Sequence, residues 1–206
     1  MHMNLRRYPI VGVSRATIEE AVEKELLPLL KADAGFAAYY ALWDEGGAGV
    51  SVSSFADAEA AHNSTSSARR WLASHTDFFP SRGEEFSGEC FVQKEAPRGA
   101  RAGSRPYVLV RLLTGVPATQ DTRAFVEQRT LPLIERSPGF RAVWMARSDR
   151  EADGAAVVTF FDSQSEAMAC HEAAVGLLRE GLPTVSVMTV VQGHATISVG
   201  PEKASL

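Results

Sequence analysis

The chain repeats itself, and this repeat constrains the fold more than any other feature of its 206 residues. Leu27-Pro28-Leu29-Leu30 recurs as Leu131-Pro132-Leu133-Ile134, at an offset of 132 − 28 = 104 residues. Four further pairs follow in the same order, namely Gly35-Phe36 with Gly139-Phe140, Phe55 with Phe161, Leu72 with Leu178, and Gly88 with Gly193. Anchors that keep their order with so little drift indicate one structural unit used twice.

Each half has the pattern β-α-β-β-α-β. We expect strands over residues 5–13, 36–44, 49–55 and 85–94, and again over 107–116, 140–147, 155–161 and within 184–199. Apolar residues at i, i+3 and i+4 mark the two helices of each half as amphipathic. Pro28 and Pro132 lie inside the first helices, where a residue without an N–H kinks the backbone.

This order of elements is the ferredoxin-like split motif. We therefore predict an α+β protein with two tandem ferredoxin-like repeats, over residues 1–94 and 106–206. Residues 95–105 between them have the composition of a flexible linker. A four-stranded sheet with helices on one face leaves its other face to be covered.

Composition and charge exclude several classes of function. The net charge is −4, from 21 basic and 25 acidic residues, so nucleic acid is not expected as an obligatory partner. No stretch approaches the ~20 apolar residues of a membrane span, and no signal peptide is visible, so we expect a cytoplasmic protein. The five histidines show no metal-ligand spacing, and there is no glycine-rich phosphate loop. We predict neither a metal nor a cofactor.

A second group of motifs lies in the first half. They are Arg6-Arg7-Tyr8 in the first strand, the segments 26–30, 35–40 and 52–61, and Trp71-Leu72. Together they resemble the antibiotic-biosynthesis-monooxygenase group of the dimeric α+β barrel superfamily, over nearly all of the first half and more weakly over the second. The resemblance implies that the two units form a dimeric-type α+β barrel within one chain. It also implies a cofactor-independent monooxygenase-like enzyme for a small phenol- or quinol-like aromatic.

The sequence leaves the activity itself open. The alternative is a non-catalytic small-molecule-binding or stress-related module of the same fold, acting as a monomeric pseudo-dimer or as a further homodimer. One branch of the superfamily degrades haem with an Asn, a Trp and a His, and Asn4, Trp71 and His75 offer these types. Trp71 and His75 are only four residues apart, and the second half has Val108 and Leu177 instead. We therefore do not expect haem.

Two pairs of residues recur in both halves. Arg7 and Arg111 share the offset of 104, and either could direct a cation toward a bound oxyanion or stabilise the barrel by an ion pair. Tyr40 and Trp144 each follow a Gly-Phe pair, and they could form an aromatic wall for a ligand or fill the core.

Further candidates lie on the second helices. His171 falls on an apolar stripe at the position of Thr65, so it is either a general base or a hydrogen-bonded structural residue. His171 and Arg111 are the best catalytic candidates, and Trp71, His75 and the adaptable Met168 are ligand-pocket candidates. We expect the better pocket in the second half, enclosed by Arg111, Trp144, Met168 and His171.

Overall fold

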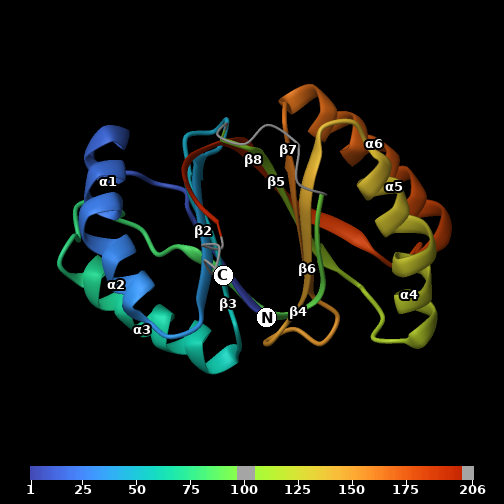
Figure 1. Ribbon diagram of the computed structural model, residues 1–206, viewed down its shortest axis with the longest axis horizontal. Helices are drawn as coiled ribbons and strands as arrows, with labels where there is room; N and C mark the ends of the chain where they lie inside the picture. The colour runs from blue at the N-terminus through green and yellow to red at the C-terminus, as the bar shows by residue number, and fades with distance from the viewer. Residues whose placement is uncertain (97–104, 201–206) are drawn as a thin grey trace, which may run out of the picture. The chain divides into compact units, whose positions relative to one another are not determined.

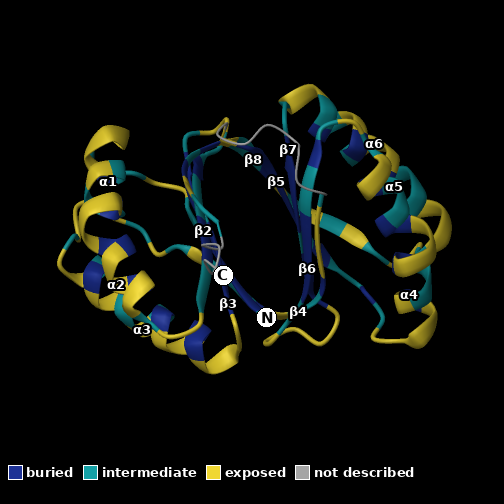
Figure 2. Ribbon diagram, viewed as in Figure 1, coloured by how far each residue is buried: buried dark blue, intermediate teal, exposed yellow. Residues whose placement is uncertain are grey.

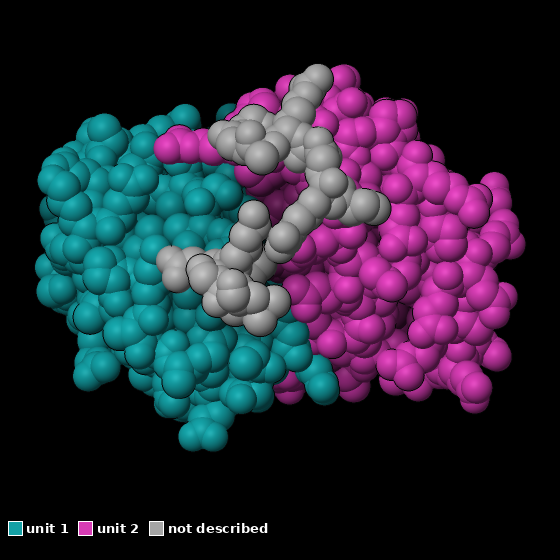
Figure 3. Space-filling view, viewed as in Figure 1, with its two compact units in different colours: residues 1–89, 195–206 teal, residues 90–194 magenta. Residues whose placement is uncertain are grey.

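The computed structural model describes residues 1–96 and 105–200, which form two compact units. Unit 1 contains residues 1–89 and the described residues from Ala195 onward, and unit 2 contains Cys90–His194 (Figure 3). The compact units therefore differ from the expected halves, because the last strand of each half continues into the other unit.

Unit 1 is a sheet with helices on one face (Figure 1). Its strands are β1 (His2–Tyr8), β2 (Phe36–Trp43), β3 (Gly49–Phe55) and the first part of β4 (Glu84–Glu95). Its helical segments are α1 (Arg15–Ala21), η1 (Val22–Leu26), α2 (Leu27–Ala32) and α3 (Ala58–Ala73). β1 pairs with both β3 and β4, and β2 pairs with β3 and with the end of β8 (Ser186–Val199), all antiparallel.

Unit 2 repeats these elements. Its strands are β5 (Tyr107–Thr114), β6 (Phe140–Ser148), β7 (Ala155–Phe161) and the first part of β8, and β5 pairs with both β7 and β8. Its helical segments are α4 (Gln120–Phe125), η2 (Val126–Thr130), α5 (Leu131–Arg136) and α6 (Gln164–Gly181). They again cover one face of the sheet (Figure 1).

The hydrogen-bonded strand order is β1-β3-β2-β8-β5-β7-β6-β4, and it is closed. The chain is thus an α+β barrel in which each half contributes one ferredoxin-like arrangement of strands and helices, as the sequence predicts. Figure 2 shows the strands largely buried and the helices exposed along their outer sides. In each unit an apolar cluster lies between the helices and the sheet.

The register of the first strands corrects the equivalence expected from the repeat. Arg6 pairs with Ser51 of β3, and Arg111 pairs with Val157 of β7, so Arg111 corresponds to Arg6 and not to Arg7. The expectation that Arg7 and Arg111 share a face was wrong by one residue. Since successive side chains of a strand point to opposite faces, this slip places Arg7 on the face away from the helices.

The two prolines are accommodated by π-helical turns. The N–H of Leu27 bonds to the carbonyl of Val22, and the N–H of Leu131 to that of Val126, each five residues back. Pro28 and Pro132 then lie in the first turn of α2 and α5, where their missing N–H is tolerated. The predicted kinks therefore take the form of one wide turn in each unit.

Candidate functional site

Each unit contains a cavity between its helices and its sheet. The cavity of unit 1 measures about 60 Å³ and that of unit 2 about 40 Å³. Most lining positions are equivalent, among them Arg6/Arg111, Val22/Val126, Leu26/Thr130, Leu30/Ile134, Ala68/Ala174 and Leu72/Leu178. The first and last residues of both π-helical turns line these cavities, and such turns are frequent at functional sites.

An arginine on the first strand is the polar centre of the unit 1 cavity. Arg6 is 7% exposed, and its Nη2 donates to Thr65 Oγ1 on α3 at 2.9 Å. Asn4 Nδ2 donates to the same hydroxyl at 3.1 Å. The nearest carboxylate, Glu85 Oε1, lies 4.0 Å from Arg6 Nε. The main partner of the Arg6 guanidinium is thus the neutral hydroxyl of Thr65, and its ion pair with Glu85 is long.

Two tyrosines line the same cavity. Burial raises the pKa of Tyr39 to about 12, against the smaller opposing effects of a hydrogen bond with Ser51 and the charge of Arg6. Burial also raises the pKa of Tyr8. Both phenols are therefore protonated at neutral pH, and they can donate hydrogen bonds but cannot serve as bases.

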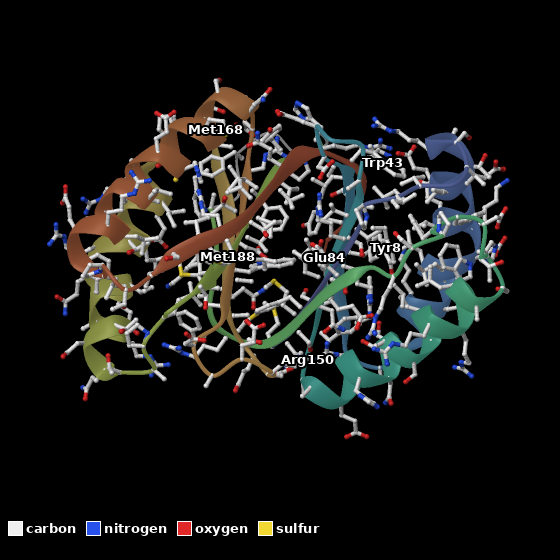
Figure 4. The ribbon with its side chains drawn as sticks, turned by 180° about the vertical axis from the view of Figure 1, so that it is seen from behind. Tyr8, Trp43, Glu84, Arg150, Met168 and Met188 are labelled. Carbon is white, nitrogen blue, oxygen red and sulfur yellow. The ribbon has the colours of Figure 1, made fainter. Side chains whose placement is uncertain are left out.

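Half-buried aromatic rings form another part of this wall. Tyr8 stacks on Phe79 with ring centroids 4.1 Å apart, and Trp43 Nε1 donates to Glu19 Oε1 at 2.7 Å. A Cβ at Gly49 would lie 3.1 Å from the Trp43 ring, so the glycine allows this close approach. Figure 4 shows Tyr8 and Trp43 between the sheet and the helices of unit 1.

Trp71 lines the unit 1 cavity, whereas His75 does not. The indole Nε1 of Trp71 donates to Glu25 Oε2 at 3.0 Å. His75 lies against the Trp71 ring at a centroid distance of 4.5 Å, with its Nε2 3.2 Å from the same Glu25 oxygen. His75 therefore packs against the Trp71 ring without lining the cavity.

In unit 2 the strand arginine is paired with a histidine. Arg111 is 2% exposed, and its Nε donates to His171 Nδ1 at 2.8 Å, at the position of the Arg6–Thr65 bond. Burial and the charge of Arg111 lower the pKa of His171, so the imidazole is neutral with its proton on Nε2. Burial also lowers the pKa of Arg111 to about 10, which leaves it charged at neutral pH. Because Nδ1 accepts from Arg111, it is not available to accept a substrate proton.

Six of the expected site residues line neither cavity, namely Arg7, Tyr40, His75, Trp144, Met168 and His171. Arg7 instead contacts Asp44 Oδ2 at 3.4 Å and Glu84 Oε1 at 3.2 Å. Successive side chains of β2 and β6 point to opposite faces of the sheet, and Tyr40 and Trp144 lie on the face away from the helices. The ring centroids of Trp144 and Phe160 are 4.9 Å apart. Met168 packs against the core of unit 2.

The cavity of unit 1 is the larger and more aromatic of the two, and of the residues expected to enclose a better pocket in the second half, Arg111 alone lines the cavity of unit 2. The preference for the second half stays a prediction. Sequence reasoning missed Arg6 and Tyr39. Strand alternation was the signal that could have found them, because Asn4, Arg6 and Tyr8 share one face of β1.

No group of three metal-ligating side chains occurs within residues 1–96 and 105–200. No helix in this part of the chain is long and apolar enough to cross a membrane.

No protein-family model matches the chain, and no curated protein does. Solved structures do match. A "putative monooxygenase" from Fusobacterium nucleatum subsp. nucleatum has a TM-score of 0.74 at 11% identity, covering 97% of this chain and 94% of that one. A "putative monooxygenase" from Lactobacillus acidophilus has a TM-score of 0.69 at 9% identity, covering 97% and 95%. An "anthrone oxidase-like protein" has a TM-score of 0.63 at 13% identity, covering 97% and 92%. At these identities the likeness establishes the fold.

Proposed function

We propose that the chain is a monooxygenase-like protein of the antibiotic-biosynthesis type, which binds a flat phenol- or quinol-like molecule in the unit 1 cavity. The proposal includes an origin by tandem duplication of one ferredoxin-like unit, with the repeats at 1–94 and 106–206. The observation that carries it is a buried arginine in an aromatic-lined cavity, repeated at the equivalent position of the other unit. The solved structures with the same fold that are named for monooxygenase and anthrone oxidase activity support it.

Arg6 would stabilise the oxyanion of the bound aromatic. A fixed cation in a buried site stabilises a developing anion much more than the same cation in water does. The protonated phenol of Tyr39 supplies a further hydrogen-bond donor, and the rings of Trp43 and Trp71 supply flat apolar surface. This combination favours an aromatic molecule with one acidic oxygen or one acidic carbon next to a carbonyl.

The size of the cavity limits how such a ligand enters. About 60 Å³ holds a few waters, but it is smaller than the roughly 150 Å³ of an apolar cavity that binds benzene. A ring therefore enters only if part of the wall moves outward. The half-buried rings of Tyr8, Trp43 and Phe79 are the part of the wall with room to move.

Anthrone is a suitable test substrate. Its oxidation consumes one O₂, places one oxygen atom on the reacting carbon, and releases the second oxygen as water with the two hydrogens of that carbon. Of the side chains that line the cavity, Tyr8 and Tyr39 are protonated at neutral pH, and the guanidinium of Arg6 has no atom that can accept a proton. The substrate proton must therefore leave to solvent, and the cavity selects substrates acidic enough to ionise beside Arg6.

The test compares Arg6→Gln with Arg7→Gln, because the neighbouring arginine lies outside the cavity. Oxygen uptake and the absorbance of the quinone product are measured with anthrone in air. We expect wild type and Arg7→Gln to oxidise anthrone alike, and Arg6→Gln to lose at least tenfold in rate, in line with the loss of one oxyanion donor. Equal rates in the two variants would refute the role of Arg6.

The second candidate is a binding module without catalysis, and the lack of a proton acceptor in the cavity lining favours it. In that case anthrone quenches the fluorescence of Trp43 and Trp71 in wild type, and Arg6→Gln weakens this binding, while oxygen uptake stays at the level of buffer. The two measurements on the same variants separate the candidates.

A further inference from the structure

Two tryptophans in the wall of the unit 1 cavity are held in the same way. The indole Nε1 of Trp43 donates to Glu19 Oε1 at 2.7 Å, and the indole Nε1 of Trp71 donates to Glu25 Oε2 at 3.0 Å. Neither glutamate lines the cavity. Both belong to the continuous helical stretch of α1 and η1, whereas one indole comes from β2 and the other from α3. One helical stretch outside the cavity therefore contacts both indoles of its wall.

Each of these indoles also has a packed face. Arg15 Cζ lies 5.2 Å from the centroid of the Trp43 ring, and the centroid of His75 lies 4.5 Å from that of Trp71. An indole has a single N–H donor, so one hydrogen bond at its edge limits the rotation of the ring. A bond to a carboxylate is stronger than a bond between neutral groups. The bond at the edge and the contact at the face together fix the plane of each ring.

Unit 2 keeps neither member of either pair. Its four equivalent positions hold three arginines and one leucine. The equivalent residues are Glu19/Arg123, Glu25/Arg129, Trp43/Arg147 and Trp71/Leu177. Between the two units, the carboxylates are thus present where the indoles are present and absent where the indoles are absent. Glutamates that served only the helical stretch itself would have no reason to change together with these rings.

We propose that Glu19 and Glu25 are positioning residues, which fix the indoles of Trp43 and Trp71 and thereby make the unit 1 cavity selective for flat rings. Stacked and edge-to-face contacts depend on the angle and the offset between two rings, so a flat ligand gains most from an indole whose plane is fixed. A puckered ring of the same size has no such preferred angle. This inference rests on the proposed function, since it names what the same cavity selects.

The indole N–H groups report the positioning directly and without a ligand. In proton–nitrogen correlation NMR spectra of the full chain labelled with ¹⁵N-tryptophan, its three tryptophans give three indole signals, which single Trp→Phe variants assign. We expect Glu25→Leu to shift and broaden the signal of Trp71, because this indole loses its acceptor. Glu19→Leu should do the same to the signal of Trp43. The signal of Trp144 in unit 2 should stay in place in both variants, which shows that the chain is folded.

Two kinds of control separate positioning from a general effect on the helix. Glu19→Gln and Glu25→Gln keep an oxygen acceptor and should keep the indole signals sharp. Glu23→Leu makes the same change of side chain at an exposed position of η1 and should shift no indole signal. The positioning role is overturned if the leucine variants of Glu19 and Glu25 leave both indole signals in place, or if Glu23→Leu shifts them equally.

Phenol and cyclohexanol test the selectivity, because they have the same size and one hydroxyl each but differ in flatness. Both are titrated by isothermal titration calorimetry, and the ratio of their affinities is compared between variants. Arg6 is present in all of them, so the different acidity of the two alcohols cancels in this comparison.

Wild type should prefer phenol. The preference should fall by roughly two- to tenfold in Glu19→Leu and in Glu25→Leu, in line with the loss of one oriented ring contact, and the glutamine variants should keep it. An unchanged preference together with shifted indole signals would overturn the selectivity. If wild type binds neither alcohol, the proposed function and the selectivity both fail, while the indole signals still decide the positioning role.

Discussion

Thr65→Val isolates the bond that holds the cavity arginine of unit 1. The substitution keeps the shape of the side chain and its branched Cβ, but it removes the acceptor of Arg6 Nη2 and of Asn4 Nδ2. Asn4 keeps its bond to the carbonyl of Ala61 at 3.1 Å, so the loss falls mainly on Arg6. A hydrogen bond to a charged group contributes about 1.5–3 kcal/mol. We therefore expect the free energy of unfolding to fall by about 2–3 kcal/mol.

This change is measured by urea denaturation at fixed pH, followed by circular dichroism and tryptophan fluorescence. For a chain of this length, about 2–3 kcal/mol corresponds to a fall in Tm of roughly 4–12 °C. Ser66→Ala is the control, because Ser66 lies on the exposed side of the same helix and, among the described residues, its hydroxyl bonds only to the carbonyl of His62. Its effect should stay within about 0.5 kcal/mol. If Thr65→Val is no more destabilising than Ser66→Ala, the Arg6–Thr65 bond does not hold the arginine.

Three further outcomes follow from the cavity residues. The pKa of Tyr39 is raised from 10.0 to about 12, so between pH 10 and 12 the unfolded chain loses this proton while the folded chain keeps it. The free energy of unfolding of wild type should therefore fall relative to that of Tyr39→Phe, by at most about 1.4 kcal/mol per pH unit, in urea titrations over this pH range. The pKa of His171 is lowered from 6.5, so as the pH falls the unfolded chain binds this proton before the folded chain does. In the same assay, the free energy of unfolding of wild type should therefore fall relative to that of His171→Asn below pH 6.5. Gly49→Ala should push the Trp43 ring, 3.1 Å from the new Cβ, and weaken anthrone binding in fluorescence titrations.

The fold could be predicted from the sequence because its signals are local and occur twice. The Leu-Pro-Leu segments, the Gly-Phe pairs and the helical periodicity each specify an element, and the repeat confirms their order. The π-helical turns could not be predicted in detail. A proline marks a disturbance of the helix, but whether the backbone kinks or widens depends on the packing of the residues before Pro28 and Pro132.

The candidate site could be predicted only in part, since it depends on register. The segment between β1 and α1 is one residue longer than the segment between β5 and α4. Equivalent residues of β1 and β5 are therefore 105 positions apart, whereas equivalent residues of the following helices are 104 apart. In a strand a shift of one residue exchanges the two faces, so the repeat predicts Arg7 although Arg6 lines the cavity. The same alternation separates Tyr39 from Tyr40. By contrast, the sequence predicts both Arg111 and His171 as candidates, and a hydrogen bond joins them directly in the structure.

The division of β8 between the two units has a consequence for biosynthesis. The second set of strand contacts of β2 joins Tyr39 to Leu42 with Ala195 to Val199, which follow β2 in the chain by about 155 residues. The domains of a nascent chain generally fold in order from the N-terminus. Here the edge of β2 has no partner until the chain has been made as far as these residues of β8, and the edge of β4 has none until β6 has been made. A chaperone that shields unpaired strand edges would therefore act on unit 1 until the end of β8 has been made.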